Sequence, residues 1–201
     1  MKDKIKSNIN FLYEVGSLRN VRRLWCQVLG DGVQNNLEHS FRVMILALLI
    51  SRMERKGNED KIMKIVLFHD LCESRSTDIA FLHREYVERH EEKASRDQLK
   101  DTVFENIEEL LSEYKERKSI ESRIVKDADD LEVDMELNEL SLLGNKVADG
   151  FIKKNRPKIR ERLYTASAKK LWDQIYTTRP DLWQSEITHT WAKNRKKNNK
   201  K

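Results

Sequence analysis

Side chains that bind metal ions occur at three separate places in this sequence. His39 stands alone, His69 and Asp70 are adjacent, and an acidic cluster follows at residues 127–130. Imidazole nitrogen together with carboxylate oxygen suits a first-row divalent ion, whereas a magnesium or calcium site would be built from oxygen alone. The pattern therefore predicts one divalent transition metal ion, with Mn, Co, Fe, Ni and Zn as the candidates.

Glu73 is the next carboxylate after the His69-Asp70 pair. On a helix it would lie one turn beyond both residues, so its side chain can face the same ion. A metal lowers the pKa of a bound water towards neutrality, and a nearby carboxylate can take that proton or pass one to a leaving oxygen. We expect Glu73 to act in catalysis, outside the set of ligands.

The elements that must position these residues are predicted to be helices. Only 6 Gly and 2 Pro interrupt a chain rich in strong helix formers. Apolar residues recur at steps of three and four in the segments that we predict as helices: residues 1–15, 37–55, 62–70, 84–117, 120–135 and 159–191. The segment 84–117 is either one long surface helix or a broken pair, and the last segment is interrupted at Arg179 and Pro180.

The connections between these helices are predicted from caps and turn residues. Asn36 is the expected N-cap of the helix that follows it, and residues 74–79 are expected to form a loop. Gly144 and Gly150 are expected to flank a further connection. The chain is predicted to be one compact all-α domain over residues 1–192, followed by a basic, disordered tail over residues 193–201.

Composition limits the classes of protein to which the chain can belong. Charged residues make up 36% of it, but both signs are interspersed and the net charge is only +5, which favours a solvated helical surface over a nucleic-acid partner. The apolar run Val43 to Ile50 is far shorter than the roughly 20 residues of a bilayer span, and residues 1–15 lack the apolar core of a signal peptide. Cys26 and Cys72 form no CxxC pattern, so we expect reduced thiols and a soluble, cytoplasmic protein.

Two short sequence motifs place the candidate metal-binding residues near the ends of predicted helices. EHS at residues 38–40 begins an apolar helix, and IVLFHDLCE at residues 65–73 ends another. In this arrangement the sequence resembles the HD-domain superfamily of metal-dependent phosphohydrolases, whose pattern is a His, a His-Asp pair and a distant Asp on successive helices. The resemblance implies a compact HD-domain helical bundle.

Four segments point more narrowly to the branch of this superfamily that contains the 5'-deoxynucleotidases. They are LRNVRRLW at residues 18–25, EHSFRV at 38–43, HDLCE at 69–73 with Asp78 and Ile79 beyond it, and IVKDAD at 124–129. The resemblance implies a homodimer that hydrolyses deoxyribonucleoside 5'-monophosphates. The roles it implies are metal ligation by His39, His69, Asp70 and Asp129, catalysis helped by Glu73, and substrate contacts from Arg22, Trp25 and Asp78.

Several alternatives remain open at this point. Helical periodicity puts Asp127 at the border of the apolar face of its helix and Asp129 nearly opposite, so Asp127 competes as the fourth ligand. Hydrolysis of a nucleoside triphosphate or a cyclic nucleotide competes with the monophosphate reaction. A non-catalytic helical module that binds nucleic acid is the alternative from a different class.

Thr77 also stands where the proteins that this sequence resembles usually have Gly.

Overall fold

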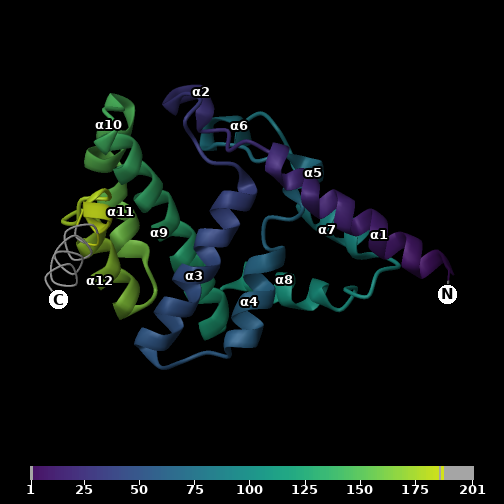
Figure 1. The fold of residues 1–201 in the computed structure, drawn as a ribbon. Helices are drawn as coiled ribbons and strands as arrows, with labels where there is room; N and C mark the ends of the chain where they lie inside the picture. Colours follow the sequence, from purple (N-terminus) through teal and green to yellow (C-terminus); the bar gives the residue numbers. More distant parts are fainter. Residues whose placement is uncertain (1, 186, 188–201) are drawn as a thin grey trace, which may run out of the picture.

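The computed structural model describes residues 2–185 and residue 187, and they form an all-α bundle, as expected (Figure 1). Among these residues the only extended pairing is an isolated antiparallel bridge between Arg22 and Asn35. The elements in chain order are α1 (Lys2–Ser17), η1 (Leu18–Asn20), α2 (Cys26–Leu29), α3 (Asn36–Glu54), α4 (Glu59–Phe68), α5 (Glu73–Ser76), α6 (Phe81–Arg84), α7 (Glu91–Leu99), α8 (Ile107–Glu116), α9 (Ile120–Leu142), α10 (Lys146–Lys154), α11 (Arg156–Arg162) and α12 (Ala166–Ile175).

Helix α9 is the centre of the bundle. It packs against α3, α4, α8, α10 and α12, and it runs behind α3 in Figure 1. Ile124 and Leu131 of α9 are fully buried in one core cluster with Val43 of α3. Removing this apolar face from water stabilises the pairing of α3 with α9. These are the two helices that carry His39 and Asp129.

The start of α3 is capped one residue earlier than expected. Asn35 is the N-cap, because its side chain accepts hydrogen bonds from the backbone N–H groups of Leu37 and Glu38, and the Glu38 carboxylate accepts one from the Asn35 N–H. Asn36 is therefore inside the helix, with its side chain buried. The Asn36 N–H donates to the carbonyl of Val21 at 3.1 Å, which holds the preceding segment against the start of α3.

Three further boundaries were predicted wrongly, and one alternative is now decided. The segment 159–191 is already broken at residues 163–165, between α11 and α12, and α12 ends at Ile175, before Arg179. Residues 74–79 are not wholly a loop, because α5 includes residues 74–76. Gly150 lies inside α10, whereas Gly144 lies between α9 and α10 with a φ of 89°. Residues 84–117 form a broken pair of helices, α7 and α8. The basic tail lies outside the described residues, so the domain limit at residue 192 stays a prediction.

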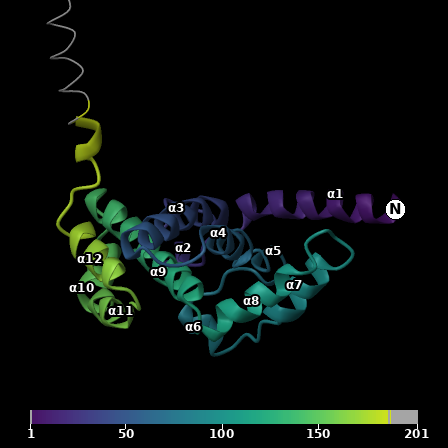
Figure 2. The same cartoon turned by 90° about the horizontal axis from the view of Figure 1, so that it is seen from below.

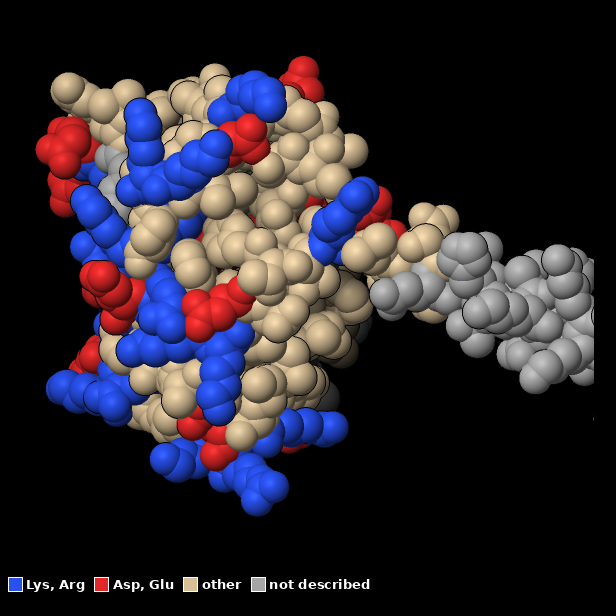
Figure 3. Space-filling view, turned by 90° about the vertical axis from the view of Figure 1, so that its left-hand side faces the viewer, with Lys and Arg blue, Asp and Glu red and all other residues tan. Residues whose placement is uncertain are grey.

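The two ends of the bundle differ in character. At the amino-terminal end, α1 extends from the body in Figure 2, and Phe11 packs there against Phe68 and Phe104. At the opposite end, the face near α10, α11 and α12 carries Lys and Arg interspersed with Asp and Glu (Figure 3). Every helix in the described part of the chain is too short or too polar to cross a membrane.

Candidate metal centre

His39, His69 and Asp70 converge where α3, α4 and α9 pack together. They offer ligand atoms that all lie within 4.8 Å of one another. The Asp70 Oδ2 atom is 3.6 Å from His39 Nε2 and 3.3 Å from His69 Nε2. Asp129 approaches from α9, and its Oδ1 atom lies 3.2 Å from His39 Nε2. The structure thus brings together the four residues that the resemblance implies as ligands.

The two imidazole rings are held in orientations that suit metal binding. His39 Nδ1 lies 2.6 Å from a Glu132 carboxylate oxygen, and His69 Nδ1 lies 2.8 Å from the carbonyl of Val66. Within the described residues, both Nε2 atoms are buried without a hydrogen-bond partner of good geometry. A proton donated from Nδ1 leaves the lone pair on Nε2, which is how metal-bound imidazoles are usually fixed. Donors about 2.1 Å from one ion lie about 3.0–3.4 Å apart, so these spacings fit a divalent ion.

The charges around these nitrogens favour a bound cation. Burial lowers the pKa of His39, but the adjacent carboxylates of Asp129 and Glu132 outweigh this effect and raise that pKa to about 9. Burial raises the pKa of Asp129, yet Lys126 and His39 together hold it well below its usual range. The carboxylates therefore attract a positive charge to His39 Nε2, and a divalent ion can supply that charge in place of a proton.

Asp127 points away from this cluster. Its carboxylate oxygens accept hydrogen bonds from the backbone N–H groups of Tyr164 and Thr165 and from the Thr165 hydroxyl, at 2.7–2.8 Å. Asp127 therefore ties α9 to the start of α12. Because α9 is packed by α3 and α4 as well as by α12, a carboxylate opposite its main apolar face, such as Asp129, still points into the protein.

Glu73 is buried at the start of α5 and is held by two donors. Asn36 donates to its Oε2 atom, and Arg89 donates to its Oε1 atom at 3.1 Å. Burial and the nearby carboxylates of Asp70 and Asp78 raise the pKa of Glu73 to about 8. A carboxyl group that titrates near neutral pH can both take and return a proton, which is the property required of a general acid or base.

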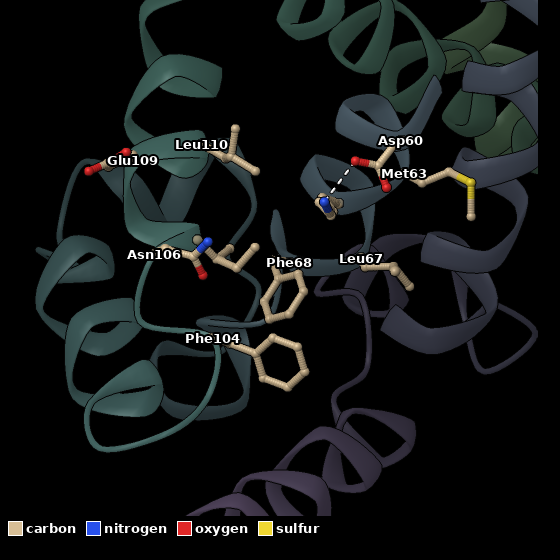
Figure 4. Close-up of a pocket in the computed structure, with 10 residues that line it drawn as sticks. Asp60, Met63, Leu67, Phe68, Phe104, Asn106, Glu109 and Leu110 are labelled. Carbon is tan, nitrogen blue, oxygen red and sulfur yellow. Dashed lines mark hydrogen bonds and ion pairs between the residues drawn. The ribbon is translucent and has the colours of Figure 1, made fainter. Parts of the chain in front are cut away.

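An open cavity of about 340 Å³ gives access to the cluster. Its walls contain Asp70, Glu73 and Asp129 together with the basic residues Arg23, Arg84, Arg89, Lys115, Arg117 and Lys126. A phosphate in this cavity would therefore meet positive charge beside the candidate ligands. A separate hollow between α4 and α8 has largely apolar walls, with Phe68 and Leu110 among its residues, and includes none of the four candidate ligands (Figure 4).

The structure places Arg22 outside the cavity. Its side chain is 68% exposed and pairs with Asp31 at 3.1 Å. The neighbouring Arg23 reaches the site instead, because its guanidinium lies 3.2 Å from Asp78 and 3.5 Å from Asp70. These two carboxylates lie more than 45 positions further along the chain and hold Arg23, not Arg22, at the cavity.

Asp78 and Trp25 have different surroundings. Asp78 is buried in the cavity wall, where its carboxylate accepts a hydrogen bond from the Leu24 N–H at 3.3 Å. Trp25 packs edge-on against Phe151, in an apolar cluster that joins α2, α9 and α10. Trp25 is not among the residues that line the cavity, so its contact with a substrate stays a prediction.

The backbone at Thr77, just before Asp78, has a conformation that favours glycine. Thr77 has a φ of 58° and a ψ of 158°, a conformation that glycine adopts easily and other residues rarely adopt. This geometry accounts for the Gly that is usual here in the proteins that the sequence resembles. In this chain, the Arg89 guanidinium donates to the Thr77 carbonyl at 2.9 Å and also to Glu73. Arg89 therefore holds the turn and Glu73 together.

Glu132 is a buried member of this site that the sequence analysis missed. It lies three residues after Asp129 and thus on the same side of α9, which was a usable signal. Arg42 donates to its Oε1 atom at 2.9 Å, while His39 occupies the other oxygen. Burial raises the pKa of Glu132, but His39 and Arg42 lower it by more than burial raises it. The net shift of this pKa is downwards, so the group stays ionised. Arg23 and Arg89 were also missed.

Replacing Glu132 with Gln is expected to weaken metal binding by about 10–100-fold, the usual cost of losing the partner of a metal-bound imidazole. An uncharged amide holds the His39 Nδ1–H less strongly than a carboxylate does. Titration with Co²⁺, followed by its visible absorption, measures the affinity without any substrate. Glu136→Gln is the matched control, because Glu136 also pairs with Arg42, at 3.1 Å, whereas among the described residues the acidic partners of His39 are Asp70, Asp129 and Glu132. Equal affinities in the two variants would contradict this role of Glu132.

Known proteins share both the sequence pattern and the fold. The profile of the HD domain family matches residues 15–172. The 5'-deoxynucleotidase HDDC2 of Bos taurus is 30% identical over 146 residues, which are 69% of this chain and 70% of that protein. The corresponding protein of Homo sapiens is 28% identical over 148 residues, 70% of this chain and 72% of that protein. A conserved hypothetical protein from Pyrococcus furiosus has a TM-score of 0.73 and 26% identity, over 85% of this chain and 99% of that chain.

Proposed function

The chain belongs to the HD-domain family of metal-dependent phosphohydrolases, and from this premise we propose that it removes the phosphate from deoxyribonucleoside 5'-monophosphates. The observation that carries the proposal is the convergence of two buried imidazole nitrogens with two carboxylates, beside a cavity that basic residues line. The proposed ligands are His39, His69, Asp70 and Asp129. The similarity to proteins named 5'-deoxynucleotidase supports the choice of substrate.

The protein's own residues have separate roles in the proposed reaction. A bound Mn, Co, Fe, Ni or Zn ion would polarise the phosphate and lower the pKa of the attacking water. Glu73 takes a proton from that water or gives one to the leaving 5' oxygen, as the phosphorus–oxygen ester bond breaks and a nucleoside and phosphate form. Asn36 and Arg89 keep the Glu73 carboxylate in one orientation.

We assign phosphate binding to Arg23. It lies beside Asp70, and Lys126 lies 2.9 Å from Asp129, so positive side chains adjoin two of the proposed ligands. The planar guanidinium can give a phosphate two parallel charge-assisted hydrogen bonds. Asp78 holds that guanidinium in the cavity wall, which makes it a positioning residue in this proposal.

Arg23→Ala is expected to lower kcat/KM by about 10–100-fold for deoxyribonucleotides and ribonucleotides alike, because a charged hydrogen bond to the phosphate is lost. Arg22→Ala is the comparison and is expected to stay within about twofold of the wild type, since an exposed ion pair contributes little. Steady-state kinetics on both variants decides between the two arginines. If Arg22→Ala lowers kcat/KM more than Arg23→Ala does, Arg22 is the residue that contacts the phosphate.

A nucleotide screen with release of inorganic phosphate tests the reaction itself. Deoxyribonucleoside 5'-monophosphates are expected to be the best substrates, and metal analysis of protein purified without chelator identifies the ion. Preferred turnover of a triphosphate or a cyclic nucleotide would favour one of the other HD reactions. Salt-sensitive binding of nucleic acid, without turnover under any divalent ion, would favour the non-catalytic module. The homodimer implied by the resemblance belongs to the same proposal.

A further inference from the structure

Arg117 forms part of the wall of the cavity that leads to the candidate metal ligands. It ends α8 in a left-handed conformation, with a φ of 54°. The Arg123 guanidinium donates a hydrogen bond to the Arg117 carbonyl at 2.9 Å. The helix end and this hydrogen bond together fix the backbone from which the Arg117 side chain projects.

The guanidinium of Arg117 lies flat on the ring of Tyr114. Its central carbon is 3.4 Å from the ring centroid, and an edge-on guanidinium at that distance would push a nitrogen into the ring. The Arg117 Nη1 atom also donates a hydrogen bond to the Tyr114 carbonyl. The stack and this bond hold the plane in one orientation. Because Tyr114 covers one face of the plane, a ligand in the cavity can contact the opposite face.

The charge of Arg117 is not used in an ion pair within the described part of the chain. Two other arginines of the cavity wall differ in this respect, because Arg23 pairs with Asp70 and Arg89 pairs with Glu73. A guanidinium is weakly hydrated and stacks readily on aromatic rings. Arginine planes are among the surfaces on which proteins stack nucleobases. The position of Arg117 therefore suits contact with a flat aromatic group of a ligand.

Two sides of the cavity differ in chemistry. Arg23, just before α2, and Glu73, at the start of α5, bring charge to one side. On the other side, α8 supplies the uncharged side chains of Leu111 and Tyr114, which lie one helical turn apart. In Figure 1, α2 and α5 lie above α8. A nucleotide has the same two-part character, since its phosphate is charged and its base has flat, largely apolar faces. The arrangement favours the phosphate near Arg23 and the base towards α8.

We propose that Arg117 binds the base of the nucleotide substrate by stacking, with the guanidinium plane between the base and the Tyr114 ring. This inference rests on the proposed function, which concerns the phosphate and leaves the base without a contact. Stacking on a plane reads no pattern of hydrogen bonds, so every base is accepted. The larger face of a purine gains more from the contact than the face of a pyrimidine does, so purine nucleotides are the preferred substrates.

Arg117→Ala and Arg117→Lys test this contact in the full chain, with two substrates. Deoxyadenosine 5'-monophosphate carries the base, whereas 2-deoxyribose 5-phosphate has the same phosphate and sugar without it. In both variants kcat/KM for the nucleotide is expected to fall by about 5–100-fold, the usual cost of losing one base stack, and kcat/KM for the sugar phosphate to stay within about twofold of the wild type. Lysine keeps the positive charge but lacks the flat face, so Arg117→Lys separates stacking from charge.

Lys118→Ala is the matched control, because Lys118 is the next residue, pairs with Glu116 at 3.1 Å and is not among the residues that line the cavity. It is expected to leave both rates unchanged, and circular dichroism checks that all variants are folded. Equal losses on the two substrates would place Arg117 at the phosphate and overturn the stack, as would full activity of Arg117→Lys or an unchanged Arg117→Ala.

A binding measurement separates this inference from the proposed reaction. If the wild type hydrolyses neither compound, the proposed reaction fails, and calorimetric titration with deoxyadenosine still tests the stack. Arg117→Ala is then expected to weaken the binding of this nucleoside by the same factor of about 5–100. Equal affinity of the wild type and Arg117→Ala for deoxyadenosine would overturn the stack.

Discussion

Asp129→Ala is expected to lose the bound metal and the phosphohydrolase activity together. The Asp129 carboxylate lies 3.2 Å from the Nε2 atom of His39, and alanine leaves that side of the ion without a donor. A metal site that loses a direct ligand should lose more than the about 10–100-fold in affinity that loss of an outer partner costs. Metal content after dialysis, measured by mass spectrometry together with turnover, checks this result.

Two neighbouring aspartates serve as controls for this variant. Asp130→Ala should keep metal and activity, because the carboxylate of Asp130 pairs with Lys126 at 3.0 Å rather than with either histidine. Asp127→Ala should destabilise the fold by about 1–3 kcal/mol, since the buried N–H groups of Tyr164 and Thr165 lose their acceptor, but the folded protein should still bind metal. If Asp127→Ala alone removes the metal, Asp127 is the fourth ligand.

Glu73→Gln is expected to preserve metal content and to lower kcat by about 10²–10⁴-fold, the usual contribution of a positioned proton-transfer group. The amide has nearly the same shape and its oxygen can still accept a hydrogen bond, but it cannot take a proton from water. Metal analysis and kcat on the same preparation separate this effect from loss of the ion.

Glu91→Gln is the matched control for Glu73→Gln. Glu91 also lines the cavity and also pairs with Arg89, so its replacement removes one negative charge from the same surroundings. Glu91→Gln should retain most of the activity. Equal losses in the two variants would indicate that the reaction depends on the charge of the cavity, and an active Glu73→Gln variant would remove Glu73 from catalysis.

The helices and the candidate ligands could both be predicted from short-range patterns in the sequence. The structure confirms the helices, and the roles of the ligands stay a prediction. Apolar spacing predicted α1, α3, α4 and α9. The N-cap predicted at Asn36 was wrong by one residue, because Asn35 caps α3. The motifs that contain His39 and the His69-Asp70 pair predict a metal site from residue type alone, since imidazole and carboxylate groups suit a borderline metal wherever the fold brings them together.

The exact members of the site depended on packing between distant segments. Helical periodicity favoured Asp127 over Asp129 as the fourth ligand, because it assumes that only one face of the helix is buried. In the folded protein the helix is packed by α12 as well as by α3 and α4, so more than one face is buried. Arg22 and Arg23 are adjacent, and their types cannot distinguish them. In the folded chain Asp70 and Asp78 hold Arg23 in the cavity wall, while Arg22 stays in solvent.

The fold class and the HD-domain family could be predicted from residue type and local spacing, and both predictions are confirmed. The kind of metal rests on the same residue types and stays a prediction. Only the tertiary structure decided that Glu132 supports His39, that Asn36 and Arg89 hold Glu73, and that Asp127 caps α12. Each of these hydrogen bonds joins residues at least 16 positions apart in the chain. Such contacts exist only after the helices have packed, so no local pattern encodes them.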